Sequence, residues 1–349
     1  MFIEIIKYKK EMKKVLLTGI SGYVGQHCAA ELLKSGYAVK GSVRSLSKTD
    51  EVVNGIKKEV DPKGNLEFCE LNLMQDEGWD KAMEGCEFVL HVASPYVTKE
   101  PKDENELIKP AVDGTLRALK AAKKAGIKRV VLTSSMVAML GDANGSIDIN
   151  QDSWSNVNSK YASAYLKSKT LAEKSAWEFI NNQEGDNKLE LVVVNPGPVY
   201  GPTLSGNLSG ESMTMFKNLI TGKMPMLPKA AINMSDVRDI AKIHVLALEN
   251  EKANGKRFIV ATENAYSFKE LAQTLKDNGY DKVSTKEAPN FLLKLMANFS
   301  DDLKGMKAFI GNTFNGDVTA TMNTFNWKPI PLKKTVLDTA ASIEEVMKK

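Results

Sequence analysis

The stretch KVLLTGISGYVG, residues 14–25, decides the fold class of this chain. It begins with the apolar run 15–17, which is typical of a buried strand, and it leads into the segment 24–33, whose apolar residues have helical spacing. Three glycines in between let the backbone turn tightly, approach a pyrophosphate and pack the helix on the strand. The start of the helix adds free N–H groups and the positive end of a dipole. We therefore predict a dinucleotide-binding turn, rather than a purely structural one, formed by Gly19, Ser21, Gly22, Tyr23, Val24 and Gly25.

Strand and helix signals alternate as far as Pro196. Strand signals, beginning with the apolar run 15–17, predict strands at residues 15–17, 38–43, 66–71, 88–92, 129–133 and 189–195. Helical spacing predicts helices at residues 24–33, 104–124 and 160–180. This alternation predicts an α/β fold, a doubly wound parallel sheet of the Rossmann type with helices on both faces.

The rhythm loosens after Pro196, where Gly, Ser, Pro and Met become frequent. A helix near residue 235, a strand at 257–260 and helical stretches near 268–275, 291–306 and 336–347 follow. We predict an N-terminal extension at residues 1–14, a dinucleotide-binding domain at 15–195 and 233–262, and a smaller C-terminal α/β substrate lobe at 196–232 and 263–349.

Composition and charge argue against several classes of protein. The 349 residues are 43% hydrophobic and 26% charged, which is ordinary globular composition. Three cysteines without a CxxC pair predict no disulfide framework, no metal site and a reducing, cytoplasmic location. No apolar run approaches the ~18–20 residues of a membrane span, and a net charge of +4 is too small to indicate nucleic-acid binding. We therefore expect no metal, no membrane and no nucleic-acid partner.

Most of the net charge lies ahead of the first strand. Residues 1–14 hold five lysines and two glutamates, a net +3. A second start at Met12 would give MKKVLLTG, a natural opening for a dinucleotide fold. We expect the preceding residues to be dispensable for folding.

The end of the second predicted strand bears on the choice of cofactor. An NAD site needs a carboxylate there to hold the ribose hydroxyls. Residues 36–48, GYAVKGSVRSLSK, contain neither Asp nor Glu; Val43 occupies the expected position, and Arg44 and Lys48 follow. An Arg can bind a 2′-phosphate through paired hydrogen bonds, so we predict NADP(H) held by Arg44 and Lys48. A solvated basic loop is the alternative.

A serine, a tyrosine and a lysine form the predicted catalytic set. Ser135 follows the fifth predicted strand, and ligands of doubly wound sheets bind beyond the carboxyl ends of strands. Tyr165 and Lys169 form YxxxK in a predicted helix and therefore share one face. YxxxK alone is weak, because nine tyrosines and 47 basic residues in 349 give about one Tyr-x-x-x-basic match by chance. An amphipathic surface helix is the alternative, and the position of the serine favours the site.

These three residues suit the reduction of a carbonyl group. Tyr165 could donate a proton to the forming alkoxide, but a phenol with a pKa of about 10 needs a nearby cation to ionise at neutral pH. Lys169 supplies that charge and can hold the nicotinamide ribose. Ser135 can hydrogen-bond the carbonyl oxygen as charge develops, and the hydride comes from the cofactor.

The motifs together resemble one family of enzymes. The stretches are TGISGYVGQH, GSVRSLSK, HVASP, PAVDGT, RVVLTSS, YLKSKTLAEKSAWEF, NPGPVYGP and SDVRDIAKIH, between Lys14 and Ala247. They resemble the extended short-chain dehydrogenases/reductases, in the group of dihydroflavonol reductase, cinnamoyl-CoA reductase and NADPH-dependent aldehyde or methylglyoxal reductase.

The resemblance implies roles for further residues. It implies that Ser135, rather than Ser134, is catalytic. It also implies that Pro196 and Val199 lie beside the nicotinamide carboxamide, and that Ala93, Ser94 and Pro95 flank the cofactor. The family usually has Asp-Leu near the adenine; this chain has Asn72-Leu73, whose amide can still hydrogen-bond the adenine.

Three functions are compatible with these observations. The leading one is NADPH-dependent reduction of an aldehyde or ketone to an alcohol, with Tyr165 as proton donor and a small-molecule carbonyl substrate. A sugar-nucleotide epimerase or dehydratase is the first alternative, although such enzymes usually retain NAD. A non-catalytic NADPH-binding regulatory module is the second, and it predicts loss of Ser135, Tyr165 or Lys169. Related enzymes occur as monomers and homodimers, so both states stay open.

Other polar and apolar residues receive structural interpretations. His27 and His244 have no cysteine or carboxylate partner at ligand spacing, so we expect them to be structural. We expect His91 to be a buried, hydrogen-bonded histidine, because Tyr165 already fills the acid role. The methionines at positions 136, 139, 213, 215, 224, 226 and 234 indicate either a loose hydrophobic pocket or plain core packing.

Overall fold

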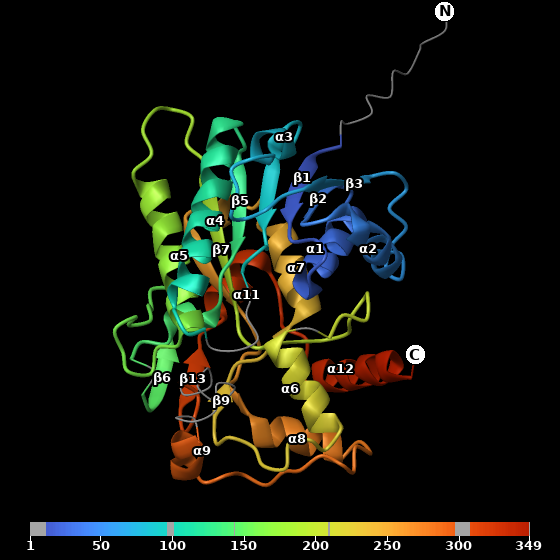
Figure 1. Cartoon of the computed structure of the whole chain (residues 1–349), viewed down its shortest axis with the longest axis vertical. Helices are drawn as coiled ribbons and strands as arrows, with labels where there is room; N and C mark the ends of the chain where they lie inside the picture. Colours follow the sequence, from blue (N-terminus) through green and yellow to red (C-terminus); the bar gives the residue numbers. More distant parts are fainter. Residues whose placement is uncertain (1–11, 96–100, 143, 209, 297–307, 349) are drawn as a thin grey trace, which may run out of the picture.

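Seven parallel strands form the main sheet of the computed structural model, which describes residues 12–95, 101–142, 144–208, 210–296 and 308–348 (Figure 1). They are β1 (Lys14–Thr18), β2 (Ala38–Val43), β3 (Leu66–Glu70), β4 (Phe88–His91), β5 (Arg129–Thr133), β7 (Glu190–Pro196) and β11 (Lys256–Val260). Their order is β11-β7-β5-β4-β1-β2-β3, so the chain winds outward in both directions from β1 and β4. This order confirms the predicted doubly wound fold, and ligands bind such sheets where the winding direction changes.

Helices cover both faces of the main sheet. One face carries α1 (Tyr23–Lys34), α2 (Thr49–Ile56) and α7 (Val237–Leu246). The other carries α3 (Trp79–Met83), α4 (Asn105–Lys124) and α5 (Ala164–Asn181). Successive strand residues face opposite sides, so Val15 and Leu17 join the first layer while Leu16 joins the second.

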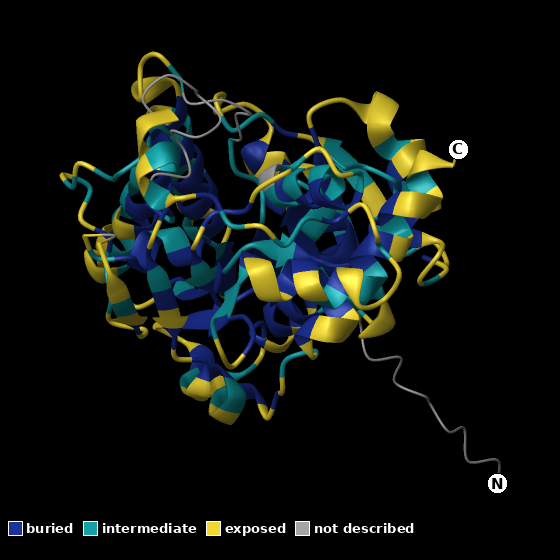
Figure 2. Ribbon diagram, turned by 90° about the horizontal axis from the view of Figure 1, so that it is seen from below, coloured by how far each residue is buried: buried dark blue, intermediate teal, exposed yellow. Residues whose placement is uncertain are grey.

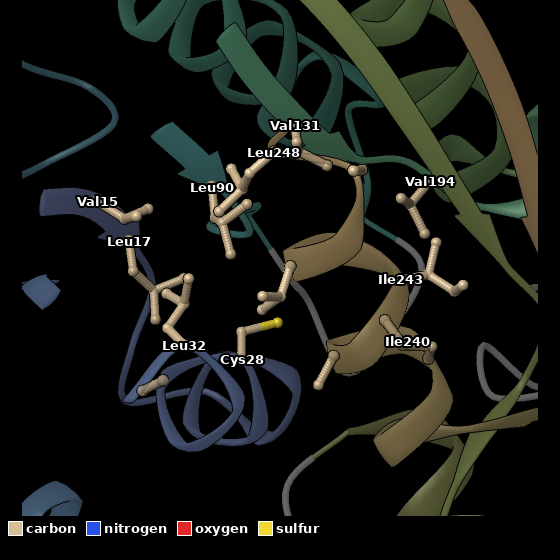
Figure 3. Packing of buried hydrophobic residues seen from close by; sticks show 14 of the residues in the cluster. Val15, Leu17, Cys28, Leu32, Leu90, Val131, Val194, Ile240, Ile243 and Leu248 are labelled. Carbon is tan, nitrogen blue, oxygen red and sulfur yellow. The ribbon is translucent and has the colours of Figure 1, made fainter. Parts of the chain in front are cut away.

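The layer between the main sheet and helices α1 and α7 is densely packed. Figure 3 shows Cys28 and Leu32 of α1 and Ile240 and Ile243 of α7 directed toward Val15, Leu17 and other strand residues. These residues are at most 2% exposed, and each large apolar side chain so buried contributes about 1.5–3 kcal/mol. The packing fixes α1, and with it the glycine turn, against the sheet.

A second, smaller sheet lies in the lower part of Figure 1. Its strand order is β12-β9-β13-β6. The strands are β6 (Ser146–Ile149), β9 (Ala231–Ile232), β12 (Tyr266–Ser267) and β13 (Thr313–Gly316). The neighbouring helices α6 (Glu211–Ile220), α8 (Phe268–Lys276) and α12 (Leu332–Met347) share a separate apolar cluster.

Helix α8 illustrates how the sequence pattern builds this region. Its buried residues Phe268, Leu271, Ala272 and Leu275 recur at helical spacing. Figure 2 shows the resulting division, with inner helix faces buried and outer faces exposed. The remaining elements are η1 (Leu46–Lys48), η2 (Met136–Met139), β8 (Val199–Tyr200), β10 (Ser235–Asp236), η3 (Glu251–Ala253), α9 (Asn290–Met296) and α11 (Thr319–Phe325).

Several element boundaries differ from the prediction. Helix α5 begins at Ala164 rather than residue 160, because Ser163 is its N-cap and accepts a hydrogen bond from the backbone N–H of Leu166. The strands of the second sheet were not predicted, and β6 lies inside the range assigned to the dinucleotide-binding domain. The proposed division into two domains stays a prediction.

Parts of two predictions lie outside the described residues. Residues 1–11 of the predicted extension are among these, as are residues 297–306 of the predicted helix near 291–306. The described end of the extension is ordered, since Lys14 begins β1 and its Nζ lies 2.9 Å from Glu67 Oε1.

Candidate active site

The carboxyl ends of parallel strands β1, β4, β5 and β7 lie at one edge of the main sheet. Two hydrogen bonds tie the segments that leave this edge. The backbone N–H of Ala93 donates to Thr18 Oγ1 over 3.0 Å, and that of Ser134 donates to the Val194 carbonyl over 2.8 Å. The predicted site residues that follow these strands therefore lie along the same edge of the main sheet.

The glycine turn between β1 and α1 leaves no room for larger side chains. Gly19 has a φ of 72°, and a Cβ there would lie 2.9 Å from Ala93 Cα. A Cβ on Gly25 would lie only 2.1 Å from the Gly19 carbonyl oxygen. The close approach of the strand, the turn and the segment after β4 thus depends on these two glycines.

The start of α1 fits an anionic ligand. Within the described part of the chain, the N-cap residue Gly22 provides no side-chain hydrogen bond to the first turn of the helix, and that turn carries no acidic residue. The first N–H groups of the helix therefore have no side-chain acceptor, and the helix dipole favours a negative charge there. A pyrophosphate has the charge and the oxygens that this position lacks.

The side chain of Tyr23 points away from the turn. Its hydroxyl donates to the Gly201 carbonyl over 2.8 Å, and burial raises the pKa of the phenol well above its usual value. His27, one turn later, lies 2.9 Å from the Pro202 carbonyl. Tyr23 and His27 thus join α1 to the segment after β8, and Tyr23 can serve a ligand at the turn only through its backbone.

The loop after β2 is basic and open to solvent. Arg44 and Lys48 are exposed, and Lys48 Nζ lies 3.6 Å from Glu51 Oε2. The acid nearest to this loop in the sheet is Glu70, which pairs with Val43 in register and accepts a hydrogen bond from the Leu46 N–H over 3.1 Å. The sequence analysis missed Glu70, because the register between two strands cannot be obtained from a single sequence.

The predicted adenine contacts have local partners. Asn72 Oδ1 accepts a hydrogen bond from the Met74 N–H over 2.9 Å, which shapes the turn after β3. Leu73 packs against α4, where a Cβ on Gly114 would lie 3.1 Å from Leu73 Cβ. The role of Asn72 toward a ligand stays a prediction.

Ser135 lies at the end of β5 and begins η2. Its Oγ accepts a hydrogen bond from the Val137 N–H over 3.3 Å and donates to the Pro196 carbonyl over a long 3.4 Å. The side chain is 9% exposed. Helix α5, which carries Tyr165 and Lys169 four residues apart, packs against η2. The fold therefore brings the elements of the predicted catalytic set together.

Lys169 is buried with few charges around it. Burial lowers its pKa to about 8, and the negative charge of Glu173 opposes that change. The positive charge of Lys169 also helps burial to lower the pKa of His91 to about 3. The charge of Lys169 is thus felt at His91, at the end of β4, whose Nδ1 lies 3.0 Å from the Thr18 hydroxyl.

Two further polar residues of this region were missed by the motif search. Glu173 is 1% exposed and accepts hydrogen bonds from Ser134 Oγ and Asn195 Nδ2. Asn195 is fully buried and also donates to the Ser135 carbonyl over 3.2 Å. An acid four residues after the lysine of YxxxK was visible in the sequence, but its partners come from distant strands.

Other predicted features have plain structural roles or lie elsewhere. Met136, Met139, Met213 and Met234 are at most 1% exposed, which favours core packing over a loose pocket. A surface groove of about 480 Å³ beside α3 and α4, lined by residues such as Asp113 and Arg117, contains none of the predicted site residues.

The described residues contain no group of three His, Cys, Asp or Glu side chains arranged to hold a metal ion. None of their helices combines the length and the apolar character that a membrane crossing needs.

Comparison with known proteins gives consistent matches. Residues 15–261 match the model of the NAD dependent epimerase/dehydratase family. A cinnamoyl-CoA reductase of Medicago truncatula is 34% identical over 269 residues, which cover 75% of this chain and 80% of that protein. The NADPH-dependent methylglyoxal reductase GRE2 of Saccharomyces cerevisiae is 31% identical over 283 residues, covering 76% and 82%.

A solved structure matches nearly the whole chain. The crystal structure of the yeast methylglyoxal/isovaleraldehyde reductase Gre2 complexed with NADPH superposes with a TM-score of 0.76 at 26% identity. The match covers 96% of this chain and 99% of that one. It therefore includes the second sheet and helix α12 as well as the main sheet.

Proposed function

The chain belongs to the NAD dependent epimerase/dehydratase family, and from this premise we propose that it reduces an aldehyde or ketone to an alcohol with NADPH. One observation carries the proposal. Tyr165 and Lys169 stand one turn apart on α5, which packs beside Ser135 at the edge of the sheet where α1 begins with uncapped N–H groups. This edge offers a proton donor, a cation and an anion-binding turn to one ligand.

The residues that would hold NADPH follow the edge of the sheet. The backbone of Gly19, Ser21, Gly22, Tyr23, Val24 and Gly25 would bind the pyrophosphate. Arg44 and Lys48 would bind the 2′-phosphate, and Asn72 with Leu73 would contact the adenine. Ala93, Ser94 and Pro95 would flank the cofactor, and Pro196 with Val199 would lie beside the nicotinamide. Bound NADPH supplies the hydride.

The side chains of the site would manage the carbonyl oxygen and its proton. Ser135 would donate a hydrogen bond to the substrate oxygen in place of its long bond to the Pro196 carbonyl. Tyr165 transfers a proton to that oxygen as carbon accepts the hydride, so that C=O becomes CH–OH. Lys169, whose pKa of about 8 leaves it mostly protonated at neutral pH, stabilises the phenolate and binds the nicotinamide ribose.

The relatives support a carbonyl substrate. Their names include a cinnamoyl-CoA reductase and a methylglyoxal reductase, both of which act on carbonyl groups. The test is NADPH consumption across aldehydes, α-ketoaldehydes, ketones and flavanones. We expect turnover with at least one class and an alcohol as the product; no consumption with any class contradicts the proposal.

The family description favours one competing function, a sugar-nucleotide epimerase or dehydratase. That function requires a bound oxidised cofactor that is regenerated in each cycle. Val43 stands where an NAD site places an acid, and the exposed Arg44 follows it, which argues against this function. Incubation with sugar nucleotides in the presence of NAD should leave them unchanged, and a new sugar nucleotide would favour this alternative.

A further inference from the structure

A buried ion pair lies beneath the predicted active site. Glu173 is 1% exposed and Arg257, from β11, is 7% exposed. Arg257 Nε donates to Glu173 Oε1 over 2.5 Å, and Trp177 Nε1 donates to the same oxygen over 3.3 Å. Taking two charges out of water is unfavourable, and apolar residues of similar volume often replace such pairs without loss of stability. Stability alone therefore does not account for this ion pair, and its place beside the predicted site indicates a role in function.

The second oxygen of Glu173 joins the two strands that end at the site. Oε2 accepts hydrogen bonds from Ser134 Oγ over 2.5 Å and from Asn195 Nδ2 over 2.9 Å. Asn195 Nδ2 also donates to the Ser135 carbonyl over 3.2 Å. Ser134 and Asn195 thus link one carboxylate to the backbone on which Ser135 is mounted.

Glu173 also acts on Lys169. The two residues are four apart in α5 and lie on one face of the helix. Lys169 is 8% exposed, and the Glu173 carboxylate raises its pKa against the lowering by burial. The other charged group on this carboxylate is Arg257, and His91 from β4 is neutral near pH 7 because its pKa is about 3.

We propose that Glu173 is a positioning residue of the proposed reductase, which holds the ends of β5 and β7 in place and stabilises the ammonium form of Lys169. The proposal rests on the function proposed above. It separates Glu173 from the residues that touch substrate or cofactor, because its carboxylate is fully engaged below the site. Its effect should appear in the pH profile of turnover rather than in the binding of NADPH.

The first variant is Glu173→Gln, which keeps the shape and removes the charge. Without the negative charge, Lys169 loses its proton at lower pH, and Tyr165 then loses the cation that stabilises its phenolate. The alkaline limb of kcat should therefore move toward lower pH, by about 1 unit. The dissociation constant of NADPH, measured by fluorescence at pH 7, should change by less than about threefold.

Two further variants make the result unambiguous. Glu178→Gln removes the same charge from an exposed position of the same helix and should leave the pH profile unchanged. Because Glu173→Gln leaves Arg257 buried without its partner, a double variant with Arg257→Gln removes both charges. The alkaline limb of kcat in this double variant should also move toward lower pH, since Glu173 is the charge that acts on Lys169.

The outcomes separate the two proposals. A wild-type protein that consumes no NADPH with any carbonyl overturns the proposed function and this inference with it. If the wild type consumes NADPH and the Glu173→Gln variant folds but has the same alkaline limb as the wild type, only the inference is overturned. If the single and double variants both fail to fold, Glu173 serves the fold only, and the inference is wrong.

Discussion

Tyr165 is the residue on which the proposed chemistry depends most directly. Tyr165→Phe removes the hydroxyl that would donate the proton, while Lys169 and the glycine turn remain. We expect kcat to fall by about 10²–10⁴-fold with little change in NADPH affinity, because general acid catalysis contributes that much. Turnover by NADPH absorbance and binding by fluorescence quenching measure the two effects.

A matched control for this variant lies four residues earlier, ahead of α5. Tyr161→Phe makes the same change at a partly buried tyrosine that packs against a core cluster and has Lys160 Nζ 5.1 Å from its ring centroid. It should retain nearly full activity. Equal losses in the two variants would mean that the effect of Tyr165→Phe is structural.

Arg44 tests the choice of cofactor. Its exposed guanidinium follows the last residue of β2, and Glu70 fixes the backbone of the same loop at Leu46. Arg44→Ala should weaken NADPH binding by about 10–100-fold, since a charge-assisted hydrogen bond contributes roughly 1.5–3 kcal/mol, and should leave NADH binding unchanged. Lys57→Ala, at an exposed position just after α2, is the control. NADH affinity equal to or above that of NADPH in the wild type would refute the assignment.

At the scale of elements, the β1–α1 turn depends on close packing. Gly25→Ala places a Cβ 2.1 Å from the Gly19 carbonyl oxygen, so helix and turn must separate. We expect NADPH binding to be lost and the free energy of unfolding to fall by about 1–3 kcal/mol, which calorimetry or urea unfolding would measure. At Gly36, after the same helix, a Cβ meets open space and only the φ of 84° is unfavourable. Gly36→Ala should therefore lower stability by about 1–2 kcal/mol and keep NADPH binding.

Elements with a strong local pattern were predictable from the sequence. The bounds of β2 and β5 agree with the prediction, because β5 contains three consecutive apolar residues and β2 begins and ends with apolar residues. The two-residue strands β9 and β12 have no periodicity, and they exist only because β9 pairs with β12 on one side and with β13 on the other. Pairing of that kind depends on tertiary contacts that no local window contains.

The candidate site divides in the same way. The glycine turn, Ser135 and YxxxK were found because each has a fixed spacing next to a predicted element. Glu70 and Glu173 were missed because their partners are distant in the sequence. Glu70 binds the N–H of Leu46 and Glu173 binds Arg257, and strand order and register alone bring these residues together. Their significance is a property of the folded chain.

For the molecule as a whole, three buried histidines predict sensitivity to acid. Burial lowers the pKa of His27 and His244 to about 4 and that of His91 to about 3. Histidines in the unfolded chain have a pKa of about 6.5, so below that pH the unfolded chain binds protons that the folded chain does not bind. The free energy of unfolding therefore decreases as the pH falls from about 6.5 toward 4. Each histidine removes about 1.4 kcal/mol per pH unit within that window.

Urea unfolding at about pH 7.5 and about pH 5.5 measures this loss. His27→Gln keeps an amide donor near the Pro202 carbonyl and removes one titrating group, so its loss of stability over the same interval should be smaller by about a third. A midpoint that is the same at both pH values would contradict the prediction.

The position of β11 in the sheet also has a consequence for biosynthesis. β11 pairs along the outer edge of β7 at Val192, Val193 and Val194, and residues 197–255 separate the two strands in the chain. On the ribosome, every predicted catalytic residue emerges before β11 does. Until then β7 presents an apolar open edge, and Glu173 lacks Arg257. A nascent chain at that stage carries the complete catalytic motif without the strand that pairs with β7, so we expect the interval between the emergence of β7 and that of β11 to be the one in which this edge is most prone to association.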